Sequence, residues 1–187
     1  LDKNPVERVE ITFSGKVAKM DTNMLTVSFL KGLLEPIMGE KVNFVNASLI
    51  TETRGVKVVT FTEGTNARGF VNLIHARVYG SDTFMEIAGT LSAKREPRLV
   101  MVKGYVTDIS PTENMLFVEN IDRPGVIGPF ATLLGKHQIN IAMMGVGRHQ
   151  RGDLALMTLN VDSEVDESVV KELREIDAVT SVKVVKF

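Results

Sequence analysis

The chain has 187 residues, which is enough for one large domain or two small ones. Its residues are 44% hydrophobic but only 6% aromatic, with no Trp, so any core is expected to be largely aliphatic. The net charge of −1 lacks the basic excess typical of proteins that bind nucleic acids, and no apolar run reaches the 18 residues that suggest a transmembrane helix. We therefore expect neither nucleic-acid nor membrane partners.

The chain contains no Cys, which excludes disulfides, thiolate catalysis, and cysteine-ligated zinc or iron–sulfur centres within it. This composition favours a cytoplasmic location. The first residue is Leu and not Met, and the residues after it lack the pattern of a signal peptide. We therefore expect this sequence to be a piece of a longer cytoplasmic protein.

The first part of the chain, residues 1–109, is expected to form an α+β domain. Residues 8–13 alternate polar and apolar side chains, as a half-buried strand does. Asp21 and Thr22 can cap a helix that runs to about Gly39. The apolar residues of that helix are Met24, Leu25, Phe29, Leu30, Leu33, Leu34 and Ile37. Further along we expect a helix over 45–54, strands over 56–62, 70–79, 84–91 and 99–109, and a hairpin turn at Gly80-Ser81-Asp82.

Residues 110–114 have the turn-forming composition of a linker. In residues 115–187 the apolar pattern predicts a strand at 115–119, a helix at 126–138, strands at 139–148 and 154–161, a helix near 165–176 and a strand at 179–185. The order βαββαβ in about 73 residues is typical of the ferredoxin-like arrangement. The sequence thus predicts an α+β protein of two domains.

The loop at residues 120–125 is the most informative candidate site. It joins a strand to a helix, so its polar side chains lie beside the free backbone N–H groups of a helix N-terminus, which suit a carboxylate or phosphate. Asp122 can accept from an ammonium group, Asn120 can donate and accept, and Gly125 permits close approach to the backbone. The same spacing also allows a structural interpretation, in which Asp122 caps the helix and Pro124 begins it.

Other candidates are weaker. Locally, Asn140 fits a turn-closing residue, and Asn43 and Asn46 fit helix capping. The basic cluster at 94–98 fits a solvated turn, or an anion site in which Arg98 takes part. The three histidines, His75, His137 and His149, have no ligand spacing, so no metal site is predicted.

No catalytic site is predicted either. Gly145-Val146-Gly147 is followed by neither a third glycine at the right spacing nor a helix, which excludes a dinucleotide fingerprint. No Ser-His-Asp order and no pair of catalytic carboxylates can be defended. We therefore expect no catalytic residue and no cofactor in this chain.

Several stretches together resemble a known family. The segments Asn120-Ile121-Asp122-Arg123-Pro124-Gly125-Val126-Ile127-Gly128, Leu133-Leu134-Gly135 and Ile139-Asn140-Ile141-Ala142 resemble the ACT domain of D-3-phosphoglycerate dehydrogenase. Gly32-Leu33-Leu34, Val42-Asn43-Phe44-Val45-Asn46-Ala47, Gly89-Thr90-Leu91 and Arg95-Glu96-Pro97-Arg98 resemble the intervening, or allosteric substrate-binding, domain of its long form. The resemblance covers essentially the whole chain, as a first domain at 1–109 and an ACT domain at 115–187.

The resemblance implies a regulatory role. The family enzyme oxidises 3-phosphoglycerate with NAD in serine biosynthesis, but this chain lacks the family's Rossmann glycines and catalytic residues. It is therefore expected to be the regulatory region, with the catalytic domains and NAD upstream. In the family, ACT domains pair side by side and L-serine binds across the junction. Carried over, one chain offers Asn120 and Asp122 with backbone N–H groups near Gly125, Val126 and Ile127, and the other chain offers Asn140. Arg98 resembles a basic position of the intervening domain's anion site.

Two alternatives belong to other classes. The chain can be a stand-alone amino-acid-binding module that uses the ACT pair to form homo-oligomers. It can also be the regulatory part of another enzyme, such as a bacterial serine dehydratase, which predicts a partner domain with cluster-ligating cysteines outside this chain, since the chain itself has none.

Overall fold

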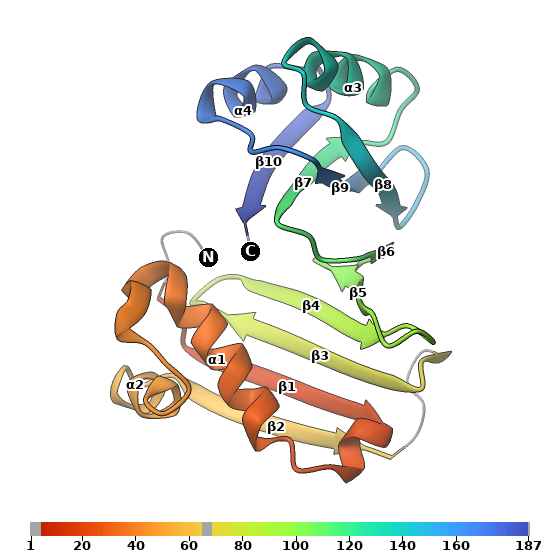
Figure 1. Ribbon diagram of the computed structural model, residues 1–187. Coiled ribbons are helices and arrows are strands. Elements are labelled where there is room, and N and C mark those ends of the chain that lie inside the picture. The colour runs from red at the N-terminus through yellow and green to blue at the C-terminus, as the bar shows by residue number, and fades with distance from the viewer. Residues whose placement is uncertain (1–4, 65–68, 187) are drawn as a thin grey trace. The chain divides into compact units, whose positions relative to one another are not determined.

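A computed structural model describes residues 5–64 and 69–186 of the chain (Figure 1). The predicted start of the first domain, Leu1, and the predicted end of the second, Phe187, lie outside the described residues. By packing, the chain divides after Leu91 into two compact units, which are described separately. In the described ranges no helix is long and apolar enough to cross a membrane.

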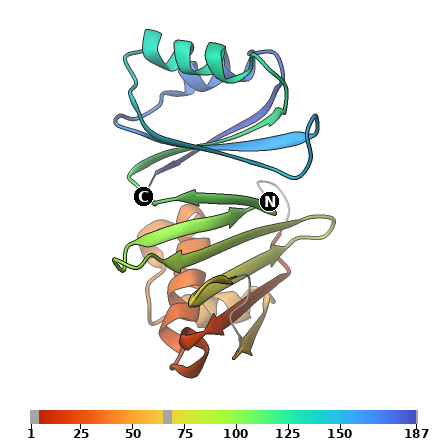
Figure 2. The same cartoon turned by 90° about the vertical axis from the view of Figure 1, so that its right-hand side faces the viewer.

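The first unit is a mixed sheet with helices packed on one of its faces (Figures 1 and 2). Its elements are β1 (Arg8–Gly15), η1 (Lys16–Lys19), α1 (Asn23–Met38), η2 (Gly39–Lys41), α2 (Ala47–Thr53), β2 (Lys57–Glu63), β3 (Asn72–Tyr79) and β4 (Phe84–Leu91). The strands lie in the order β2-β1-β3-β4. β1 is parallel to β2 and antiparallel to β3, and β3 forms a hairpin with β4. These elements confirm the predicted helices and the strands before Leu91.

The alternation in β1 builds the core of this unit. Val9, Ile11 and Phe13 are fully buried against Leu30 and Leu34 of α1, whereas the residues between them face the other side of the sheet. Of the two residues predicted to cap α1, Asp21 lies before the N-cap position, and its carboxylate accepts from the backbone N–H of Asn23, the first helical residue, at 2.9 Å. The Thr22 side chain makes no cap bond.

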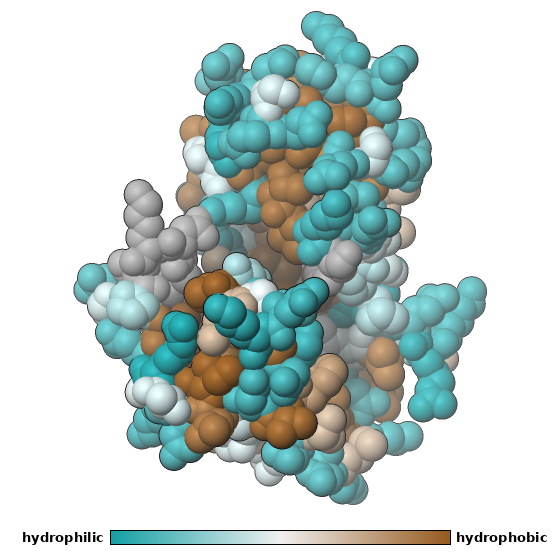
Figure 3. All heavy atoms as spheres, turned by 60° about the vertical axis from the view of Figure 1, so that its left-hand side comes forward, coloured by the Kyte–Doolittle hydropathy of each residue, from teal (hydrophilic) through white to brown (hydrophobic). Residues whose placement is uncertain are grey.

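The loop before α2 is held by its two asparagines. Asn43 Oδ1 accepts from the backbone N–H groups of Val45 and Asn46, and Asn46 Oδ1 accepts from the backbone N–H of Asn43. These bonds are local, as predicted, but Asn46 occupies the N-cap position of α2 without a side-chain cap bond, so its predicted capping of the helix is wrong. The bonds hold Phe44 and Val45 in an exposed position, and Val45 is 93% accessible. Figure 3 shows apolar side chains among polar ones on this side of the unit.

The second unit contains the predicted βαββαβ arrangement. Its elements there are β7 (Asn114–Ile121), α3 (Ile127–Lys136), β8 (Ile141–Arg148), β9 (Leu154–Val161), α4 (Glu167–Arg174) and β10 (Val179–Lys186). They form a four-stranded antiparallel sheet in the order β10-β7-β9-β8, with α3 and α4 on one face (Figures 1 and 2). Leu116 and Val118 of β7 pack with Phe130 and Leu134 of α3 in its core. The predicted ferredoxin-like fold is confirmed.

The run at 99–109 is not one strand, which corrects the prediction. It forms a hairpin of β5 (Pro97–Val102) and β6 (Tyr105–Ile109). Lys103 and Gly104 both have positive φ, 53° and 81°, as the two-residue turn of a hairpin requires. The apolar residues on both sides of this turn hide it, because Lys-Gly is a weaker turn signal than Asn-Gly or Asp-Gly.

The hairpin covers the sheet face that lies opposite α3 and α4. Thr107 of β6 hydrogen-bonds through its side chain to Thr158 of β9 at 3.0 Å, and both residues are buried. A Cβ on Gly147 of β8 would overlap the carbonyl oxygen of Val106. By packing, the hairpin thus belongs to the second unit, although the sequence analysis assigns all of it to the first domain, residues 1–109. The linker at 110–114 stays a prediction, because the division by packing lies after Leu91.

Candidate functional site

The strand β7 brings Asn120 to the predicted effector loop. Leu116, Val118 and Asn120 alternate along β7, so they lie on one face of the sheet, the face that meets the helices. Each of them pairs with a residue of β9. The strand continues through Ile121, two residues further than predicted, because Ile121 still pairs with Leu154. Asn120 is only 4% accessible, and its Nδ2 donates to the carbonyl oxygen of Ile121 at 2.9 Å. Among the described residues its Oδ1 has no hydrogen-bond partner, which leaves a buried acceptor at this site.

The N-terminus of α3 has no side-chain cap among the described residues. Val126 occupies the N-cap position and Ile127 begins the helix, with no acidic residue in the first turn. The structural interpretation, in which Asp122 caps this helix, is therefore wrong, and Pro124 lies before the helix instead of beginning it. Gly125 has a φ of 92°, a conformation that side chains rarely adopt, so this turn needs glycine. The first N–H groups of α3 thus remain available to an anion.

Asp122 is paired with an arginine that the sequence analysis does not identify. Its Oδ2 accepts from Nη1 of Arg148, the last residue of β8, at 2.9 Å. The hydrogen bond from Arg148 lowers the pKa of Asp122 below its ordinary value, and the positive charges of Arg148 and Arg151 act in the same direction. The backbone N–H of Asp122 donates to the carbonyl oxygen of Asp153 at 2.7 Å. Asp122 is therefore an ionised carboxylate on an anchored backbone.

Asn140 lies directly before β8, and its side chain hydrogen-bonds to Asp162. Its Nδ2 donates to Asp162 Oδ2 at 2.6 Å, and its carbonyl oxygen accepts from the Asp162 backbone N–H. This agrees with the local, turn-closing interpretation of Asn140. One of the two amide N–H donors is engaged by Asp162, so Asn140 can offer its amide oxygen and its second N–H to a ligand. β8 forms an edge of the four-stranded sheet, so Asn140 lies where a second chain can approach.

Arg98 uses its guanidinium within the β5–β6 hairpin. Nε donates to Asp108 Oδ1 at 2.6 Å, Nη2 to the Asp108 carbonyl oxygen at 2.9 Å, and Nη1 to Ser110 Oγ at 2.8 Å. These contacts tie the start of β5 to the end of β6. The anion site at Arg98 stays a prediction, and any anion there must compete with three local bonds.

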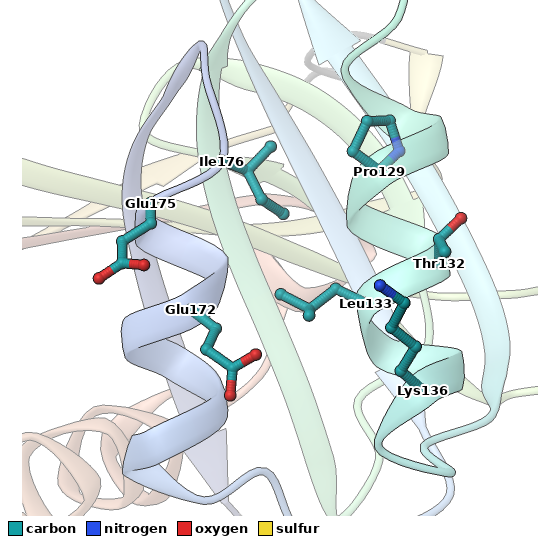
Figure 4. A pocket seen from close by; sticks show the side chains of 7 residues that line it. All are labelled: Pro129, Thr132, Leu133, Lys136, Glu172, Glu175 and Ile176. Carbon is teal, nitrogen blue, oxygen red and sulfur yellow. The ribbon is translucent and has the colours of Figure 1, made fainter.

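A groove lies between α3 and α4 (Figure 4). Its volume is about 490 Å³, and it contains none of the predicted effector residues. Leu133 and Ile176 line it together with the charged groups of Lys136, Glu172 and Glu175. It is an open groove between helices and does not enclose a ligand.

The described residues contain no cluster of three or more His, Cys, Asp or Glu that could hold a metal ion. Gly145 and Gly147 lie inside β8 and pair with Thr158 and Leu156 of β9. A dinucleotide needs a glycine loop between a strand and a helix, so these glycines do not fit NAD.

Residues 1–103 match the model of the D-3-phosphoglycerate dehydrogenase intervening domain. The chain belongs to this family. Residues 114–178 match the model of the ACT domain, so the chain joins a phosphoglycerate dehydrogenase intervening domain to an ACT domain, as the resemblance implied.

Relatives match over nearly the whole chain. The D-3-phosphoglycerate dehydrogenase of Bacillus subtilis is 34% identical over 98% of the chain, and that of Methanocaldococcus jannaschii is 36% identical over 97%. The corresponding protein of Archaeoglobus fulgidus is 32% identical over 93%. The matches cover 35%, 34% and 33% of those relatives, so the chain spans about a third of their length.

Proposed function

We propose that this chain binds an α-amino acid, L-serine, as an allosteric effector at the loop between β7 and α3. The observation that carries the proposal is the buried, unpartnered Oδ1 of Asn120, which precedes a helix N-terminus without a side-chain cap. A buried acceptor without a partner is costly, and a ligand donor removes that cost.

The two charges of an amino acid match this site. The ligand carboxylate lies at the first N–H groups of α3, near Gly125, Val126 and Ile127. The ligand ammonium donates to the ionised carboxylate of Asp122 and to Oδ1 of Asn120. The described chain therefore supplies groups for both ends of a zwitterion.

We infer that the site is completed by a second copy of the chain. β8 is an edge strand, and Met143, Met144 and Val146 on it are exposed apolar residues. Edge strands of this kind favour pairing. A two-fold axis perpendicular to the sheet makes the two β8 strands antiparallel, so that Asn140 of each copy lies at the Arg148 end of the other copy's β8, beside its Asp122 loop. In this arrangement the ligand stabilises the pair, because residues of both chains contact it.

We also propose that the chain regulates NAD-dependent oxidation of 3-phosphoglycerate by catalytic domains of a longer, cytoplasmic protein. All three relatives named above are D-3-phosphoglycerate dehydrogenases, which favours this activity over a serine dehydratase or a stand-alone module. NAD then binds to domains outside this chain. An assay of the complete gene product tests the activity, and serine is expected to inhibit it.

Titration calorimetry on the 187-residue chain tests the effector site. We expect wild type to bind serine, and Asp122→Ala to weaken binding by about tenfold or more, since a hydrogen-bonded charge is lost. Asp177→Ala is the matched control, because Asp177 pairs with Arg123 of the same loop and has no predicted ligand contact. The absence of serine heat for wild type, or equal affinities for wild type and Asp122→Ala, contradicts the proposal.

A further inference from the structure

Arg148 faces the effector site without being assigned to it by any motif. Its guanidinium gives one N–H, on Nη1, to Asp122 Oδ2 at 2.9 Å, and its side chain is 55% accessible. A guanidinium has five N–H donors, so most of its donors remain for other partners. Arg148 is thus a half-exposed cation beside the carboxylate that is proposed to receive the ligand ammonium.

The other cations near the loop are placed differently. Arg123 is paired with Asp177, and Arg151 acts on Asp122 through its charge and not through a side-chain hydrogen bond. Within the described residues, Arg148 is therefore the cation that hydrogen-bonds to the Asp122 side chain.

This pairing changes which ligands the site accepts. An isolated carboxylate attracts any cation, whereas a carboxylate already paired with a guanidinium is close to neutral overall. An ammonium that binds to Asp122 shares the carboxylate with Arg148 and lies about 4–6 Å from the guanidinium, where like charges repel. A carboxylate on the same ligand offsets this repulsion, because it is attracted to the guanidinium.

We infer that Arg148 is a specificity-determining residue, which makes the site reject simple amines and accept zwitterionic amino acids. The inference rests on the proposed function, since it concerns the same site. It does not require Arg148 for folding, because a partly exposed ion pair contributes little to stability.

The test compares serine with ethanolamine, which keeps the hydroxyl and the ammonium but lacks the carboxylate. Dissociation constants are measured by NMR chemical-shift titration, which detects weak binding. In Arg148→Gln we expect ethanolamine to bind more tightly and serine more weakly. The dissociation constant of ethanolamine divided by that of serine should therefore fall by about tenfold. Arg148→Lys keeps the charge and should keep most of the ratio.

Arg151→Gln is the matched control, since it removes a neighbouring positive charge but no hydrogen bond to the Asp122 side chain. Its ratio should stay within about twofold of wild type. If wild type binds serine but Arg148→Gln leaves the ratio unchanged, the inference is overturned and the effector site stands. If wild type binds no serine, the proposed function and the inference fail together.

Discussion

At the scale of single residues, the ion pair of Asp122 and Arg148 makes a pH-dependent contribution. The pKa of Asp122 is lowered in the folded chain, first by the hydrogen bond from Arg148. A lowered folded-state pKa means that the contribution is fully present above the ordinary value of 3.8 and is lost as the pH falls through the folded-state pKa. The site therefore holds a carboxylate at neutral pH, ready for an ammonium.

Carboxyl-carbon NMR titration measures this directly. We expect the Asp122 midpoint in wild type to lie below 3.8, and the midpoint in Arg148→Gln to rise towards 3.8. Arg151→Gln should raise it less, because that residue acts only through its charge. An Asp122 midpoint that does not move in Arg148→Gln would show that Arg148 is not the cause of the shift.

The sequence analysis predicts Asp122, Asn120 and Gly125 as effector-site residues and does not include Arg148, which the structure pairs with Asp122. The three lie in one segment of six residues, where a local pattern can be recognised. Arg148 is 26 residues from Asp122, and the pair exists because β8 and the loop meet at one end of the sheet. A signal was present, since Arg148 ends a predicted strand, but strand register cannot be obtained from one sequence.

At the scale of elements, the β5–β6 hairpin is the part that the sequence predicts least well. Regular alternation in β1 and helical spacing in α1 and α3 identify those elements, because burial on one face imposes the period. The hairpin instead looks like one apolar strand in the sequence, because Lys103-Gly104 is a weak signal for a turn. Its contact with the open face of the sheet is tertiary, and no local pattern encodes it.

Gly147→Ala tests how tightly the hairpin is packed on β8. The added methyl group would overlap the Val106 carbonyl oxygen and lie 3.2 Å from Tyr105 Cβ, so we expect a loss of about 1–3 kcal/mol in the free energy of unfolding. Urea denaturation provides the measurement. Gly128→Ala in α3 is the control, because no atom lies within 4 Å of its added Cβ and alanine favours helix. Equal stability of Gly147→Ala and wild type would mean that the hairpin is not held against β8.

At the scale of the whole molecule, the two-domain α+β organisation follows from the sequence, because each domain has its own apolar periodicity. The position of the division does not follow in the same way. The family model of the intervening domain ends at residue 103, inside the β5–β6 turn, whereas packing divides the chain after Leu91. The family model and the packing disagree because of the β5–β6 hairpin. Its first strand lies within the family model of the intervening domain, but the hairpin packs on the sheet of the second unit.

The central claim is that serine binds between two chains, with Asp122 from one and Asn140 from the other. The decisive measurement is the serine-binding capacity of a refolded equimolar mixture of Asp122→Ala and Asn140→Ala chains. Each variant alone should lack intact sites, but a mixed pair has one site in which both residues are wild type. Random pairing makes half of the pairs mixed, so capacity should return to about a quarter of the wild-type value. A mixture that binds no more serine than the separate variants would contradict a site shared between chains.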